Sequence, residues 1–169
     1  MQKHSGAHAR MGATDVCPFV PIARVTMDDC IKYSKELAKM VGKELKIPVF
    51  LYEFSATNKD RINLANIRSG EFEGMTEKLR LPEWKPDYGP GKPHVSAGVT
   101  AIGARNFLIA YNINLNTKDK KIATDISLDI REQGRNKRDE RGKFVRDKNG
   151  IPIKSPGILK SCKAVGWYI

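Results

Sequence analysis

A strand, a helix and a second strand follow one another near the start of the chain, and this succession constrains the fold more than any other feature. Residues 15–21 are apolar after Asp15 and carry prolines that cannot donate to a ladder, which indicates a short strand. Thr26 is a good N-cap, and apolar residues recur at helical spacing over 27–45. Pro48 ends that helix, and the apolar run 49–54 is typical of a buried strand. The order predicts a β-α-β unit.

The stretch that follows this unit is less regular. Residues 57–80 are charged and broken by glycines, with helical patches near 64–67 and 75–79, which predicts a surface excursion. Prolines and glycines crowd residues 84–98, so a shaped loop is expected there rather than a helix or strand. Glycines in such loops let backbone N–H groups approach a flat ligand closely, and a simple connector is the alternative interpretation.

Further strands are predicted beyond this loop. Residues 99–103 indicate a short strand, and alternating apolar side chains over 105–115 predict a longer strand with one face in a core. Residues 162–169 are expected to form a last strand. The predicted fold class is α+β, with a mixed β-sheet and helices packed on one face up to about residue 104, then the start of a second, similar β/α subdomain.

The last sixty residues combine a helical pattern with dense charge. Thr117 is expected to cap a helix whose inward side chains are Ile122, Ala123, Ile126 and Ile130. Lysines and arginines crowd residues 131–148, which is typical of a solvated loop. Asn149-Gly150 is a turn signal, with weak strand-like arms on either side of it.

Composition narrows the class of protein. The chain has 169 residues and a net charge of +11, which attracts anions of almost any kind, nucleic acid included. It has no zinc-ligand spacing and no aromatic-rich RNA-binding motif, so basicity alone supports a nucleic-acid module. Cys17, Cys30 and Cys162 lie far apart, which predicts reduced thiols and no metal site. Without a long apolar run, a soluble cytoplasmic protein is expected.

His8 and Arg10 stand just before the first predicted strand. Histidine gives and takes a proton near neutral pH, so an imidazole at this loop-to-strand junction is a candidate general acid/base. A loop histidine without a chemical role is the alternative. Arg10 has two open interpretations, a fork for a substrate carboxylate or a partner of a protein carboxylate.

The same region and several later blocks resemble the formiminotransferase family. The run HARMGATDVCPFVPI is the most specific, and the resemblance covers nearly the whole chain in collinear order. Further matching blocks are VTMDDC at 25–30, IPVFLY at 47–52, RSGEFE at 68–73, PDYGP at 86–90, GAR at 103–105, FLIAYNINL at 107–115 and GWY at 166–168.

The resemblance implies an activity. Members of this family transfer the formimino group from N-formimino-L-glutamate to tetrahydrofolate, a step of histidine degradation and one-carbon metabolism. It also implies subdomains of ferredoxin-like character with a substrate groove between them, tetrahydrofolate as the cosubstrate, and a homodimer. Residues 1–104 would be the remainder of the N-terminal subdomain and 105–169 the first part of the C-terminal one, so that the chain is an internal piece whose activity alone is in question.

The resemblance also assigns site residues. The family's catalytic histidine precedes the R-M-G-A turn, a position that His8 holds here, with Ala9 where the family usually has proline. Its folate-binding segment corresponds to a loop that opens with the PDYGP block, and Lys92 in it is a candidate for a carboxylate of the glutamate tail. The expected binding residues are Gly89, Pro90, Gly91, Lys92, Pro93, His94, Val95, Ser96, Ala97 and Gly98.

Two alternatives stay open beside the basic nucleic-acid module. A folate-binding fragment without turnover would bind the cosubstrate and transfer nothing. A close enzymatic variant would take a formyl group from N-formylglutamate in place of the formimino group.

Overall fold

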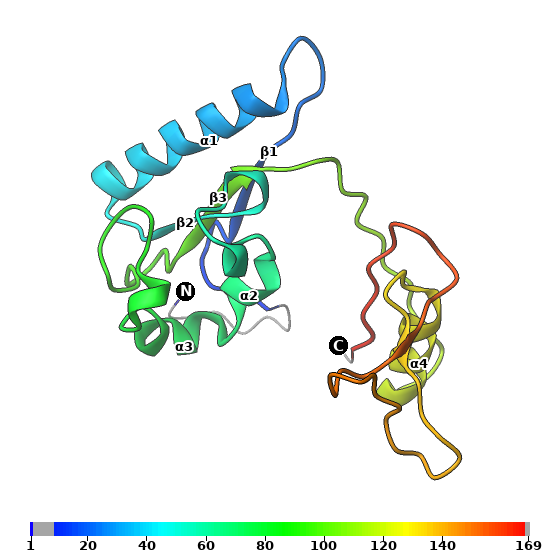
Figure 1. The fold of residues 1–169 in the computed structure, drawn as a ribbon. Helices are drawn as coiled ribbons and strands as arrows, with labels where there is room; N and C mark the ends of the chain where they lie inside the picture. The colour runs from blue at the N-terminus through cyan, green and yellow to red at the C-terminus, as the bar shows by residue number, and fades with distance from the viewer. Residues whose placement is uncertain (2–8, 168–169) are drawn as a thin grey trace. The chain divides into compact units, whose positions relative to one another are not determined.

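The computed structural model describes residues 1 and 9–167 (Figure 1). The chain forms two compact units, Met1–Ile109 and Ala110–Ile169.

The first unit is built on a parallel three-stranded sheet. Its strands are β1 (Val16–Phe19), β2 (Val49–Leu51) and β3 (Thr100–Ala104). They lie in the order β1-β3-β2, so the strand that comes last in the sequence is central. Every residue of β3 is buried, because β3 has a neighbouring strand on each side and helices above and below. The β-α-β unit predicted from the sequence therefore has a third strand inserted between its two strands.

Helix α1 (Met27–Met40) covers one face of this sheet. Thr26 and Asp29 form the capping box at its start, as their spacing predicts. The helix runs on through a single π-helical turn, Val41–Leu45, and ends at Lys46. Its Ala38 packs with Val49, Leu51 and Ile102 to form one layer of the core. The predicted helix and its end before Pro48 are both confirmed.

The opposite face of the sheet is covered too. Phe50, Tyr52 and Ala101 point to this side, as expected where neighbours along a strand alternate between faces. Helices α2 (Leu64–Arg68) and α3 (Glu71–Lys78) supply Ile67 and Met75 to the same core layer. The α+β class is confirmed, but the prediction of helices on one face of a mixed sheet needs correction. Both faces are covered because the strands are apolar on both sides, and the three strands are parallel.

Lys78 closes the junction between α2 and α3. Its ammonium group donates to the carbonyl oxygens of Ile67 at 2.9 Å and Ser69 at 3.0 Å, and also to that of Asn66. It lies 4.0 Å from the centre of the Trp84 ring. The helical patches predicted within 57–80 are thus packed against the sheet, since their apolar side chains complete its second core layer.

The strand predicted over 105–115 is not formed. Residues 106–115 are extended without a ladder, and no backbone hydrogen bond joins them to another part of the described chain. Their apolar side chains are exposed, up to 92% for Ile109. The alternating pattern is that of a strand, but a strand needs a neighbour to pair with and a layer to cover its face. Residues 106–115 have neither.

The second unit contains one helix and a short antiparallel ribbon. Helix α4 (Lys120–Ile130) is capped by Asp119, whose side chain accepts from the Lys121 amide at 2.8 Å. Thr117, the predicted cap, instead accepts a hydrogen bond from the Asp119 amide. Ile122 and Ile126 were expected to face inward, and they are 46% and 43% exposed because little of the unit packs over them.

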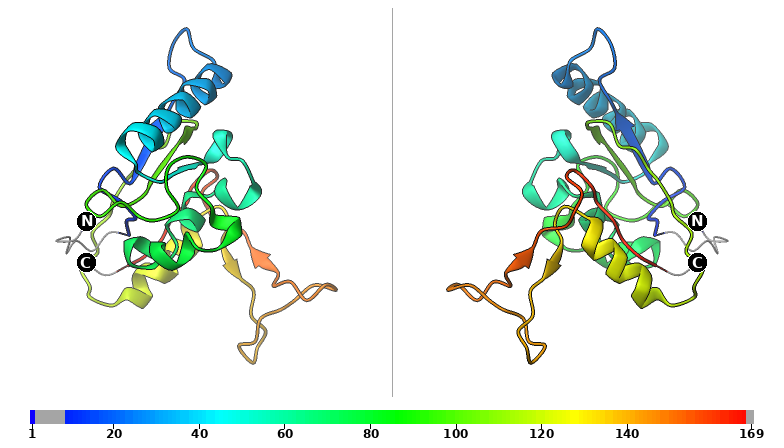
Figure 2. Two further views of the ribbon diagram at one scale, coloured as in Figure 1. Left: turned by 90° about the vertical axis from the view of Figure 1, so that its left-hand side faces the viewer. Right: turned by 90° about the vertical axis from the view of Figure 1, so that its right-hand side faces the viewer.

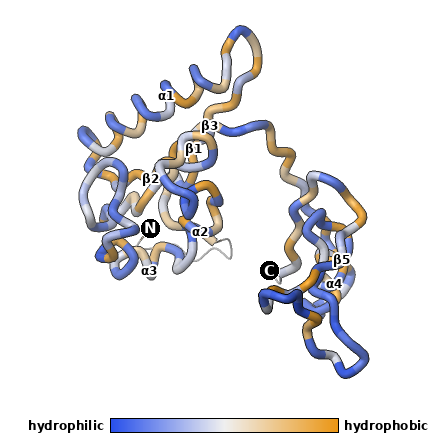
Figure 3. Tube along the Cα trace, in the orientation of Figure 1, coloured by the Kyte–Doolittle hydropathy of each residue, from blue (hydrophilic) through white to orange (hydrophobic). Residues whose placement is uncertain are grey.

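The charged segment is more ordered than its composition suggests. Strands β4 (Arg135–Asn136) and β5 (Lys154–Ser155) pair antiparallel, and a turn at Asn149-Gly150 is present as predicted (Figure 2). Figure 3 shows this part of the chain as predominantly hydrophilic. The last predicted strand is absent over 162–167, where the chain is irregular and mostly exposed or half-buried, and residues 168–169 lie outside the described part.

Candidate functional site

Residues 11–13, which follow His8 in the sequence, meet the end of loop 89–98. His8 itself lies outside the described residues, so the structure does not test its assigned role. The Ala13 amide donates to the Ala97 carbonyl at 2.9 Å, and the Val99 amide donates to the Met11 carbonyl at 3.0 Å. The sequence resemblance assigned both segments to one site. The fold joins residues 11–13 to residues 97–99 through backbone hydrogen bonds.

Two glycines make this junction possible. A Cβ on Gly12 would lie 2.0 Å from the Val99 carbonyl oxygen, and a Cβ on Gly98 would lie 2.4 Å from the Met11 carbonyl oxygen. Gly98 also has a φ of +74°, in the region that residues with a side chain rarely adopt. Only glycine lets the two backbones approach this closely.

The last five residues of the loop form a compact turn. The amides of His94 and Gly98 donate to each other's carbonyl oxygens at 2.9 and 2.8 Å. The Nδ1 atom of His94 accepts from the Ala97 amide at 3.1 Å, so the neutral ring carries its proton on Nε2. Lys92 and Val95 are exposed, and Lys92 makes no side-chain hydrogen bond or ion pair with the described residues.

The loop begins beside β2. The Val49 amide donates to the Tyr88 carbonyl at 2.9 Å, and Gly89 follows with a φ of +87°. A Cβ on Gly89 would lie 2.5 Å from the Ile47 carbonyl oxygen. Both ends of loop 89–98 are thus tied to the sheet, the first at β2 and the second just before β3.

A buried ion pair anchors the start of the loop, and sequence reasoning did not find it. Arg61 donates to Asp87 Oδ2 at 2.7 Å, and the two side chains are 6% and 9% exposed. Asp87 also accepts from the Leu51 amide at 2.8 Å, and from Thr57. Arg61 donates to the Lys85 carbonyl at 2.7 Å. The PDYGP block includes Asp87, but nothing in the local pattern around Arg61 marks it as the partner.

Arg10 binds protein carboxylates, which settles one of its two open interpretations. Its guanidinium group donates to Glu71 at 2.6 Å and to Glu73 at 2.8 Å. The hydrogen bond with Glu73 is the largest cause of a raised pKa at Arg10, and Glu71 acts in the same direction. The two glutamates stand at the start of α3, so this helix holds the residue two positions after His8.

Asp15 holds the same segment from the other side. Its carboxylate accepts from the Met11 amide at 2.7 Å and forms an ion pair with Arg68 of α2. The residues that follow His8 are therefore held by α2, by α3 and by the end of loop 89–98.

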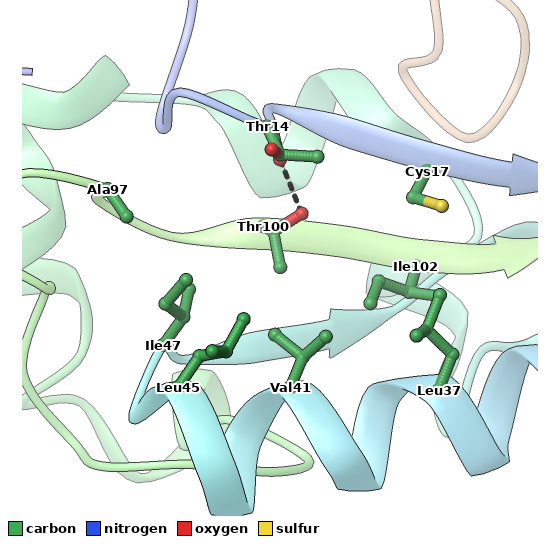
Figure 4. Close-up of a pocket in the computed structure, with 9 residues that line it drawn as sticks. All are labelled: Thr14, Cys17, Leu37, Val41, Leu45, Ile47, Ala97, Thr100 and Ile102. Carbon is green, nitrogen blue, oxygen red and sulfur yellow. Dashed lines mark hydrogen bonds between the residues drawn. The ribbon is translucent and has the colours of Figure 1, made fainter.

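An apolar cavity of about 120 Å³ lies between α1 and the sheet (Figure 4). Thr14 and Ala97 stand at its rim, and the side chains of Leu37, Val41 and Ile102 face it. Burial raises the pKa of the Cys17 thiol on its wall, which disfavours the reactive thiolate. A pocket for a drug-sized ligand usually measures roughly 300–1,000 Å³. This cavity is a gap in the core beside the site rather than a place for a whole folate.

Among residues 1 and 9–167, no three His, Cys, Asp or Glu side chains gather as a metal site. None of the helices in this part of the chain is long and apolar enough to span a membrane.

Comparison with known proteins gives the family. Residues 1–105 match the N-terminal subdomain of the formiminotransferase domain, and residues 110–169 match the formiminotransferase domain. A glutamate formimidoyltransferase of Streptococcus pyogenes serotype M1 is 55% identical over 134 residues, which cover 79% of this chain and 45% of that protein. A formimidoyltransferase-cyclodeaminase of Dictyostelium discoideum is 46% identical over 170 residues, which cover 100% of this chain and 28% of that protein.

A glutamate formimidoyltransferase of Thermoplasma acidophilum is 44% identical over 160 residues, covering 90% of this chain and 52% of that protein. The chain thus spans about half, or less, of the length of these relatives. Both units are matched, and the conclusion agrees with the resemblance found in the sequence blocks. The chain belongs to the formiminotransferase domain family.

Proposed function

We propose that the protein acts as a glutamate formimidoyltransferase, which moves the formimino group of N-formimino-L-glutamate to tetrahydrofolate. The observation that carries the proposal is the family match over both units, together with relatives named for this activity at 44–55% identity. Those names favour a formimino donor over a formyl donor. The protein would serve histidine degradation and one-carbon metabolism in the cytoplasm, as a homodimer that takes small-molecule substrates.

The proposal divides the chain into two parts of one enzyme. Residues 1–104 would belong to the N-terminal formiminotransferase subdomain and residues 105–169 to the C-terminal one. A ferredoxin-like arrangement of each subdomain is part of this proposal. The substrates would be held by the segment around His8 and by loop 89–98.

The reaction depends on proton transfer and needs no covalent intermediate with the protein. The N5 atom of tetrahydrofolate attacks the amidine-like carbon of the donor, and a tetrahedral adduct forms. The C–N bond to glutamate breaks once that nitrogen gains a proton. His8 would take the proton that N5 loses and pass it to the departing amine, a role worth roughly 10² to 10⁴ in rate.

The backbone around this step supports a binding role for loop 89–98. Both ends of the loop are tied to the sheet, and its end is hydrogen-bonded to residues 11–13. A ligand held by the loop would therefore lie near the segment that follows His8. The side chain of Lys92 is exposed and suits a carboxylate of the glutamate tail.

His8→Gln in the full-length protein tests the proposal. Formimino transfer and tetrahydrofolate binding are measured separately, with N-formimino-L-glutamate and N-formylglutamate compared as donors. We expect transfer to fall by roughly 10² or more while the Kd for tetrahydrofolate stays within about twofold. His4→Gln, four residues earlier, is the matched control and should keep full transfer. Unchanged transfer in His8→Gln would remove the role of His8, and binding without any transfer by the unmodified protein would favour the folate-binding alternative.

A further inference from the structure

The charged segment of the second unit, residues 135–155, contains the same kind of turn at two places. Asp139 and Asp147 are eight residues apart, and each accepts two backbone amides of its own turn through Oδ1, at 2.8 to 3.0 Å. The arginine before each aspartate donates to the carbonyl of the glycine that ends the turn, Arg138 to Gly142 and Arg146 to Gly150, both at 2.6 Å. The two turns are therefore close structural equivalents.

Backbone hydrogen bonds join the three stretches of chain that flank these turns, at Lys137, Val145 and Ile153. The Val145 amide donates to Lys137, the Ile153 amide to Val145, and the Lys137 amide to Ile153, at 2.8 to 3.0 Å. The three residues stand at eight-residue intervals and close a ring of hydrogen bonds. Such a ring gives a small, charged segment a defined shape without a large apolar core.

The positive charge of this segment is poorly balanced. Residues 135–155 contain eight lysines and arginines against three acidic residues. Two of those three acids, Asp139 and Asp147, hold backbone amides. Arg135 is the exception among the cations, since it pairs with Asp129 at 2.6 Å and with Asp125. No carboxylate of the described residues pairs with Lys137 or Arg138.

These cations border a groove of about 580 Å³ within the second unit. Arg131, Lys137 and Arg138 line it together with the apolar side chains of Leu128, Phe144 and Val145. Asp125 also lines the groove, where its carboxylate pairs with Arg135. The Arg138 guanidinium stacks on the Phe144 ring at 4.2 Å and uses one of its five N–H donors on Gly142. The groove thus offers cationic donors beside a flat, half-exposed aromatic surface.

We propose that this groove binds a nucleoside phosphate, either free or as part of a single strand. Guanidinium and ammonium groups suit phosphate oxygens, and the Arg138–Phe144 stack suits the face of a base. The volume lies within the range of small-ligand pockets. This site is separate from loop 89–98 and does not depend on the proposed transfer reaction.

Calorimetric titration of the whole chain tests the proposal. The probes are AMP, inorganic pyrophosphate, a ten-residue single-stranded uridylate oligonucleotide and benzoate, in phosphate-free buffer with low and with physiological salt. We expect saturable binding of AMP that is weaker at higher salt, and weaker or no binding of benzoate. Tighter binding of AMP than of the oligonucleotide per site assigns the groove to free nucleotides, and the reverse order assigns it to a strand.

The repeated turns supply a matched pair of variants. Arg138→Ala and Arg146→Ala lose the same contact to a turn glycine and the same charge, but only Arg138 lines the groove. We expect Arg138→Ala to weaken AMP binding about tenfold and Arg146→Ala less than about twofold. Phe144→Ala should weaken AMP binding and leave pyrophosphate binding nearly unchanged.

A second pair of variants tests the proposal if Arg138→Ala does not fold. Lys137→Met and Lys148→Met each remove one charge from the same segment, and Lys137 lines the groove whereas Lys148 does not. A loss confined to Lys137→Met supports the site. Equal losses within both pairs, equal affinity for benzoate and AMP, or no saturable binding of any phosphate probe would overturn the proposal.

Discussion

Arg61 and Asp87, twenty-six residues apart, form an ion pair of 2.7 Å that is almost completely buried. Arg61 also lies 5.0 Å from the centre of the ring of Phe50, which belongs to the second core layer. The pair joins residues 57–80, which follow β2, to Asp87, which lies two residues before loop 89–98. It is thus a link between the core and the candidate binding loop.

Removal of Arg61 should be costly for this reason. Arg61→Ala leaves the Asp87 carboxylate buried beside a gap, and breaking a buried pair in this way costs about 3–5 kcal/mol. We expect a fall of that size in the free energy of unfolding, measured with urea. Arg80→Ala removes an exposed arginine that pairs with Glu77 and should change this free energy by less than about 1 kcal/mol. Similar effects of the two variants would show that burial of the Arg61 pair is unimportant.

Loop 89–98 offers a comparison of two glycines. Gly98→Ala places a methyl group against the Met11 carbonyl at a positive φ, whereas a Cβ on Gly91 meets no atom within 4 Å. Gly98→Ala should lower the free energy of unfolding by about 2 kcal/mol or more and weaken tetrahydrofolate binding. Gly91→Ala should leave the free energy of unfolding nearly unchanged. Equal behaviour of the two variants would contradict the close junction with residues 11–13.

Lys78 should make stability depend on pH. Burial lowers the pKa of its ammonium group to about 8, below the usual 10.5 of lysine. Between pH 8 and 10.5 the unfolded chain then binds more protons at this position than the folded chain, so the contribution of Lys78 to stability rises with pH. Below about pH 8 the group is charged in both states, and its contribution is at its lowest.

The pH effect is measured as a difference between proteins. Urea unfolding of the unmodified chain and of Lys78→Met and Lys78→Arg at pH 7.0 to 10.0 isolates it from Cys17 and Tyr52, whose pKa values are raised by burial. Those two groups make stability fall as pH rises, opposite in sign to Lys78. Neither variant of Lys78 should show the added rise above pH 8. A parallel pH dependence in all three proteins would argue against the lowered pKa.

Residues 106–115 should exchange their backbone amides rapidly. They have no backbone hydrogen bonds to other described residues, unlike β3, which ends at Ala104. Hydrogen exchange followed by mass spectrometry of peptides from this region should show full labelling while peptides from β3 are still protected. Slow exchange over 106–115 in the isolated chain would mean that this segment has found a strand to pair with.

Much of the first unit could be predicted from local pattern. The capping box at Thr26, the helical spacing that follows it and the apolar runs around 16–19 and 49–51 each depend on residues close in sequence. The turn at Asn149-Gly150 also depends only on residues close in sequence. Where the pattern was clear but no neighbour was present, as at 106–115, the prediction was wrong, because a strand is stable only in a sheet.

Part of the candidate site could likewise be predicted from the sequence, and part could not. The assignment of His8 and of loop 89–98 came from resemblance between sequence blocks, and the described residues leave His8 untested. The junction of residues 11–13 with 97–99 could not be read from the sequence, since its partners are more than eighty residues apart. Arg10 had two chemically reasonable partners, and only the position of α3 decided between them.

The sequence by itself determined the family, the α+β class and the identity of most elements, because propensity, capping and periodicity act over a few residues. Tertiary structure alone decided the order β1-β3-β2, the helices on both faces and the burial of Arg61 with Asp87. These features depend on groups that the folded chain brings together from distant positions, and the gain from burying and pairing them exists only once the whole unit has formed.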